Sequence, residues 1–148
     1  RAPHPDNLEV SWGRLLSRAL KSGFNCGAES ASSNSRIIRS TREWLMKYQY
    51  NDEILIIIQW STWEREEWLI NNEYYQINAS GTDDIPESHK LYYKEYVANV
   101  DWTTKTQEAH EEIWQFHKEL DSQNVKHIFF NGNNDFSTFS SMSFIIID

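Results

Sequence analysis

The stretch Gly23–Ser61, GFNCGAESASSNSRIIRSTREWLMKYQYNDEILIIIQWS, decides the fold that the sequence predicts. Phe24–Cys26 reads as a short strand, and a turn of small residues follows it. The apolar spacing in Ser35–Tyr48 predicts a helix. Ile54–Ile58 is an apolar, β-branched run, typical of a central parallel strand covered on both faces. Strand, turn, helix and buried strand in this order predict a βαβ crossover.

The rest of the chain continues this alternation of helices and strands. We expect an irregular N-terminus over Arg1–Val10. Helices are predicted over Ser11–Leu20, Trp63–Asn72, Glu87–Val100 and Trp102–Gln123, and strands over Glu73–Ala79, Val125–Phe130 and Ser143–Asp148. The pattern predicts an α/β fold: a three-layer α/β/α sandwich with a mostly parallel, flavodoxin-like sheet, in one domain of residues 1–148.

Composition narrows the possible functions. The net charge of −8 argues against a surface that binds nucleic acid. No apolar run approaches the roughly 20 residues that span a bilayer, so we expect no membrane segment. The sequence also shows no signal peptide and no glycine-rich phosphate loop. Cys26 is the single cysteine, which excludes an internal disulfide and a cysteine-based zinc site. A cytoplasmic or virion-associated location is compatible with these features.

Polar residues follow both strands of the opening stretch, where open α/β sheets usually place their chemistry. The turn Ala31–Asn34 could present backbone N–H groups and an amide to a pocket, as an oxyanion hole requires. The alternative is an ordinary N-cap by Ser33 or Asn34, and spacing alone favours it. After the next strand, Gln59, Ser61, Thr62 and Arg65 could contact a substrate. Here the alternative, which is again favoured, is a polar strand end that starts a helix, with Arg65 in surface ion pairs.

Taken together, FNCGAESASSNSRIIR and EILIIIQWSTWEREEW resemble the SGNH (GDSL-like) hydrolase superfamily, and most closely its divergent members from tailed phages. The later IFFNG (Ile128–Gly132) resembles the next strand in those proteins. The matching residues are Ser33, Asn34, Arg36, Ile37 and Arg39 in the first block, and Gln59, Trp60, Ser61, Arg65 and Glu66 in the second.

The sequence also departs from the family pattern. The family's block-II glycine aligns with Ala31, and no G-x-N-D motif directly follows the strand that ends at Ile58. GNND (Gly132–Asp135) matches that motif but comes one strand too late, so we treat it as a coincidental match. The block that carries the nucleophilic serine and the final Asp-x-x-His block are both absent. We therefore expect either a fragment that lacks these blocks or a degenerate, non-catalytic relative.

The resemblance implies a hydrolase that acts on an ester or acetyl group of a glycan or lipid, without a cofactor or metal. It places Ser33 and Asn34 at the oxyanion side and Gln59, Trp60, Ser61 and Arg65 around the pocket. The chain itself is expected to be inactive, because no catalytic residue is identified in it. The alternative is a non-catalytic binding or virion-associated module on the same fold.

Two further sets of residues bear on catalysis. Asn134 and Asp135 follow the strand Val125–Phe130 and could serve a third, phosphate- or glycan-modifying site. That site requires the end of this strand to lie beside the Ser33–Asn34 turn. The histidines offer no convincing base for a triad. His110 and His117 share one helix face and are expected to be solvated, whereas His127 is expected to be packed within a strand.

Overall fold

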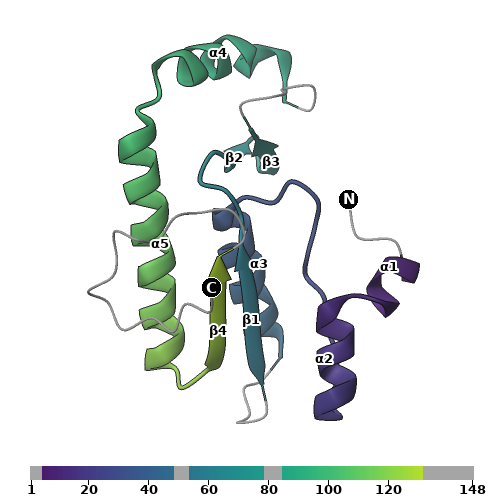
Figure 1. Ribbon diagram of the computed structural model, residues 1–148. Coiled ribbons are helices and arrows are strands. Elements are labelled where there is room, and N and C mark those ends of the chain that lie inside the picture. Colours follow the sequence, from purple (N-terminus) through teal and green to yellow (C-terminus); the bar gives the residue numbers. More distant parts are fainter. Residues whose placement is uncertain (1–4, 49–53, 79–84, 132–148) are drawn as a thin grey trace.

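The computed structural model describes residues 5–48, 54–78 and 85–131 (Figure 1). Its elements along the chain are α1 (Pro5–Glu9), α2 (Trp12–Leu20), α3 (Asn34–Lys47), β1 (Leu55–Trp60), β2 (Glu66–Ile70), β3 (Glu73–Ile77), the 3₁₀ turn η1 (Glu87–His89), α4 (Lys90–Asn99), α5 (Trp102–Ser122) and β4 (Lys126–Asn131). Helices α2, α3, α4 and α5 and strands β1, β3 and β4 confirm predicted elements.

A parallel pair of strands forms the centre of the fold. β1 and β4 lie side by side, with Leu55 opposite Lys126 at one end and Trp60 opposite Asn131 at the other. Their connection contains the hairpin β2–β3 and helices α4 and α5 (Figure 1). Because the strands are parallel, their carboxyl ends meet at one edge of the sheet. This confirms an α/β fold with a parallel sheet.

Helices α3 and α5 pack together against one face of this sheet. Ser35 bonds to Glu112, and Arg42 bonds to Glu119 two helical turns later on both helices, so the two helices run parallel. The core between the helices and the sheet consists of Ile38, Leu45, Ile58, Trp60, Ile113, Phe116, Leu120, Val125 and Phe129. This core packs the two strands, and with them the carboxyl edge of the sheet, against the helices.

The opposite face of the sheet is partly open among the described residues. Leu55 is 40% exposed and Ile128 is 36% exposed. Trp12 of α2 packs edge-on against Phe130, with ring centroids 5.5 Å apart. Most of the apolar stripe of α2 is nevertheless exposed, including Leu15. The predicted cover on both faces of β1 is therefore present on only one face in this part of the chain.

Three local predictions are wrong. Phe24–Cys26 is irregular, so no strand precedes α3 in the described residues, and the parallel crossover joins β1 to β4 instead. The N-terminus forms the short helix α1 where irregular chain was expected. Trp63–Asn72 was expected to be a helix, but it contains β2, which pairs antiparallel with β3.

The hairpin turn explains the last of these errors. Asn71 and Asn72 have φ angles of 51° and 65°. A two-residue turn with both φ angles positive matches the twist of a hairpin, and asparagine tolerates this conformation better than most residues. The predicted strand Ser143–Asp148 lies outside the described residues. No helix in the described ranges is long and apolar enough to cross a membrane.

Candidate functional site

The start of α3 meets the end of β1 at the carboxyl edge of the sheet. Asn34 accepts a hydrogen bond of 2.8 Å from the backbone N–H of Ser61 through its Oδ1 atom. Arg65 donates to the hydroxyl of Ser61 over 3.0 Å. Asn34 is 3% exposed, and its buried Nδ2 has no hydrogen-bond partner among the described residues. The Asn34 side chain thus has a buried N–H donor with no partner among the described residues.

The N-cap of α3 sets the position of Asn34. Ser33 is fully buried, and its Oγ accepts a 3.1 Å bond from the backbone N–H of Arg36. This confirms the predicted cap, which satisfies one of the free N–H groups of the first turn. Ala31 has a φ angle of 63°, a left-handed conformation that favours glycine. Ala31 therefore adopts a backbone conformation that is typical of glycine.

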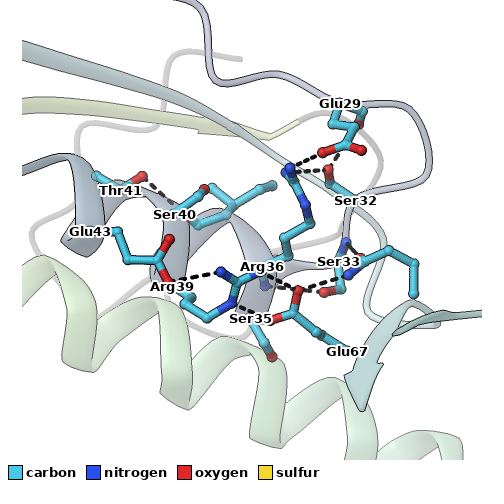
Figure 2. A network of polar contacts seen from close by, with 12 residues as sticks. Glu29, Ser32, Ser33, Ser35, Arg36, Arg39, Ser40, Thr41, Glu43 and Glu67 are labelled. Carbon is cyan, nitrogen blue, oxygen red and sulfur yellow. Dashed lines mark hydrogen bonds and ion pairs between the residues drawn. The ribbon is translucent and has the colours of Figure 1, made fainter. Parts of the chain in front are cut away.

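A second polar chain joins this cap to the hairpin. The N–H of Ser33 donates to Oε1 of Gln76 over 3.0 Å, and Nε2 of Gln76 donates to Glu67 over 2.8 Å. Arg39 binds both oxygens of Glu67, each at 2.7 Å (Figure 2). The guanidinium of Arg39 also lies over the Tyr74 ring, 3.9 Å from its centroid. The Glu67 side chain is only 4% exposed. The hairpin is thus held against α3 by a buried ion pair.

The turn before α3 is held by another arginine. Arg36 forms an ion pair with Glu29 and donates a 3.0 Å bond to the hydroxyl of Ser32 (Figure 2). Ser32 Oγ in turn donates to the backbone carbonyl of Glu29 over 2.9 Å. These bonds close the turn on itself, so Ser32 serves the shape of the loop.

Glu112 of α5 approaches the first turn of α3. It accepts a 3.1 Å hydrogen bond from Ser35 Oγ. Burial raises the pKa of Glu112 above its ordinary value, and the bond from Ser35 and the charges of Arg42 and Lys105 oppose that rise. The hydroxyls of Ser32, Ser33 and Ser35 are therefore all engaged in bonds with arginine, glutamate or backbone groups.

The structure separates the six residues of the predicted site. Asn34, Ser61 and Arg65 form one hydrogen-bonded chain, with Ser33 beside them. Trp60 is 2% exposed and packs in the core against the Phe116 and Phe129 rings, and Gln59 is exposed. Because side chains alternate along a strand, Gln59 points to the opposite face of the sheet from Trp60.

The histidines of α5 and β4 are buried or half-buried within the fold. His110 is 3% exposed, so its predicted exposure to solvent is wrong. His117 Nδ1 lies 2.7 Å from His127 Nε2, and His127 Nδ1 lies 2.7 Å from the carbonyl of Val125. His127 is packed, as predicted. No cluster of three or more metal-ligating side chains occurs in the described ranges.

The end of β4 reaches the same edge of the sheet. Asn131 lies opposite Trp60 in the register, one residue before Ser61. The third proposed site required this strand end to lie beside the Ser33–Asn34 turn, and the bond between Ser61 and Asn34 places the two close together. Asn134 and Asp135, which would act in that site, lie outside the described residues.

Sequence reasoning did not identify Gln76, Glu67 or Glu112 as part of this region. Gln76 is 43 residues from Ser33, and Glu112 is 77 residues from Ser35. One available signal was the Asn71–Asn72 pair, which indicates a hairpin and so brings Glu67 opposite Gln76. For Glu112, no pattern in the sequence indicated its contact with Ser35.

Chemically, the edge combines three features that favour a negatively charged oxygen. They are the N-terminal end of a 14-residue helix, the buried Nδ2 group of Asn34 and the guanidinium of Arg65. A helix N-terminus carries a partial positive charge, and buried N–H groups bind anionic oxygens strongly. The arrangement is therefore suited to binding or stabilising an anion.

Comparison with known proteins yields one match. No curated protein and no solved structure matches the chain. A family model described as a family of unknown function (DUF6071) matches residues 6–129. That range includes α3, the hairpin, β1 and the first four residues of β4. The chain therefore belongs to the DUF6071 family.

Proposed function

We propose that this chain is an SGNH-like hydrolase domain that acts on an ester or acetyl group of a glycan or lipid. The observation that supports the proposal most is the buried Nδ2 of Asn34 at the start of α3. In acyl transfer, the carbonyl oxygen gains negative charge in the tetrahedral intermediate, and a fixed N–H donor stabilises it. Asn34 would provide that donor, held in place by Ser61.

The nucleophile and the base of such a reaction belong to sequence blocks that this chain does not contain. The serines beside Asn34 have other bonding partners, which agrees with a role in shaping the turn. We therefore expect the chain by itself to hydrolyse no ester. A version that carries an upstream serine turn and a downstream Asp-x-x-His segment is expected to be active without a metal or cofactor.

We also propose that the fold is the three-layer sandwich of this superfamily. Helices α3 and α5 form one outer layer. Trp12 of α2 already contacts Phe130 on the other face, and Leu55 and Ile128 offer that face an apolar surface. These contacts support a second outer layer that begins with α2.

Hydrolysis of 4-nitrophenyl acetate by the extended version tests the function. N34A is expected to lower kcat by about 10²- to 10³-fold, because one oxyanion donor is removed. N99A is the matched control, since Asn99 bonds only to the exposed backbone of its own helix. The absence of turnover in an extended version with an intact serine would refute the hydrolase.

The second candidate is a non-catalytic binding module on the same fold. It is favoured by the hydrogen bonds of the Ser32, Ser33 and Ser35 hydroxyls, each of which already has at least one partner within the fold. We expect its partner to be a small molecule or a glycan ester and not nucleic acid or a membrane. Binding without turnover in the extended version would select this candidate.

A further inference from the structure

Arg65 differs from the other arginines in its bonding. Each of the others in the described residues forms an ion pair with glutamate: Arg14 and Arg18 with Glu9, Arg36 with Glu29, Arg39 with Glu43 and Glu67, and Arg42 with Glu119. Arg65 is half-buried, and its side chain bonds to Ser61 Oγ. It has no carboxylate partner among the described residues. In a chain of net charge −8, this is unexpected.

The glutamates next to Arg65 in the sequence do not neutralise it. Glu66 forms an ion pair with Lys105 and accepts a 2.8 Å bond from Trp68 Nε1. These partners outweigh the effect of burial and hold the pKa of Glu66 below its ordinary value. Glu67 forms an ion pair with Arg39, and Glu64 is exposed. The local sequence WEREE therefore leaves a positive charge at the site edge.

Ser61 brings this charge to the start of α3. Its hydroxyl binds Arg65, and its backbone N–H binds the buried carboxamide of Asn34. We propose that this edge binds an anionic oxygen group, a carboxylate or a phosphate, with Arg65 as the charge partner. An arginine can bind two oxygens of either group at once through its planar fork. The Nδ2 donor of Asn34 and the helix N-terminus favour the same charge.

The inference also names a substrate class, and in that respect it rests on the hydrolase function proposed above. The substrate would be an ester that carries a negative charge close to the scissile group. Arg65 would then act in binding and selection, whereas Asn34 would act on the reacting oxygen. Arg65 is thus expected to affect KM for an anionic ester and to have little effect on a neutral one.

The test is a titration of the ¹⁵N-labelled chain with sodium acetate and sodium phosphate, followed by NMR at constant ionic strength. We expect saturable shifts of the Arg65 Nε–H and Ser61 N–H signals. R65Q should weaken the apparent Kd at the Ser61 signal at least about tenfold, because a charged hydrogen-bond donor is lost. R18Q is the matched control, since Arg18 is exposed and pairs with Glu9. Acetamide, which is neutral, should produce no saturable shift.

The two anions distinguish a carboxylate ligand from a phosphate ligand. Saturation by acetate alone indicates a carboxylate ligand, and saturation by phosphate alone indicates a phosphate ligand. Shifts that R65Q leaves unchanged, or that follow ionic strength, would overturn the inference. An unchanged thermal midpoint for R65Q would show that the variant remains folded, and R65K, which retains the charge, should bind with intermediate affinity.

The hydrolase and the anion site can fail separately. If the extended version hydrolyses the neutral acetate ester while Arg65 binds neither anion, the proposed function stands and the anion site is wrong. If Arg65 binds an anion and no ester is hydrolysed, the anion site stands and the hydrolase is refuted.

Discussion

Gln76 can satisfy its two neighbours in only one orientation of its amide. The Glu67 carboxylate accepts hydrogen bonds and cannot donate them, so the Nε2 group must face it. The Oε1 atom then faces the N–H of Ser33. A single side chain of the hairpin therefore holds the N-cap of α3 in place.

Replacing Gln76 by methionine should lower the free energy of unfolding by about 2 kcal/mol, because Ser33 and Glu67 each lose a buried partner. Urea denaturation measures this change. Amide hydrogen exchange at Ser33 should also become faster. Q107M is the control, because Gln107 is exposed on α5. Equal stability of Q76M and Q107M would show that the bridge contributes nothing.

At this scale, local interactions could be predicted and distant ones could not. A cap by Ser33 or Asn34 could be predicted from the local sequence, and in the structure the cap is Ser33. The position of Trp60 was not clear from its polar neighbours, although it lies on the same face of β1 as Ile58. Gln76 depends on a contact across 43 residues, which no local pattern contains.

Among the elements, the hairpin shows why a pattern can mislead. Charged residues with good helix propensity occupy Trp63–Asn72, and they favoured a helix. In β2, however, Trp68 packs against Tyr96 of α4, and Glu66 on the same face pairs with Lys105 of α5. Glu67 points to the other face and pairs with Arg39 of α3. The sequence did not show the apolar–polar alternation typical of a strand, because both faces of β2 contain a charged residue. Tertiary ion pairs here override the local preference.

The contact between α5 and β4 predicts a dependence of stability on pH. A carbonyl only accepts, so His127 Nδ1 must donate to Val125, and in its neutral form His127 then accepts from His117 at Nε2. Burial, followed by the charge of His127, lowers the pKa of His117, and Asp121 on the same helix partly opposes this. The folded chain thus binds a proton at His117 less readily than the unfolded chain does.

The free energy of unfolding should therefore be highest above the unfolded pKa of about 6.5 and should fall as the pH decreases below it. For one proton, the slope is at most about 1.4 kcal/mol per pH unit. Urea denaturation between pH 7.5 and 5 measures it. H117F, which retains an aromatic ring beside Trp114, should flatten the curve, and H89N should not. A curve for H117F as steep as that of the unmodified chain would contradict this assignment.

For the whole molecule, alternating elements correctly predicted an α/β fold with a parallel sheet. The two apolar runs that form β1 and β4 were sufficient to predict this fold class, because a buried parallel strand is recognisable from its apolar composition. The number of layers was harder to predict, since it depends on which face each helix covers. Helices α3 and α5 share one face, and α2 reaches the other face mainly through Trp12.

The proposed third layer predicts that Ile128 is shielded from solvent reagents. In a C26S background, the thiol introduced by I128C should react with a disulfide reagent at least about tenfold more slowly than that of M46C. A covering layer must open before the reagent enters, and an opening free energy of about 1.4 kcal/mol already gives this factor. Met46 is the matched control, because it is an apolar residue that is 76% exposed on α3. Equal labelling rates would show that this face is open and that the fold has two layers, because the packing of α3 and α5 shields only the other face.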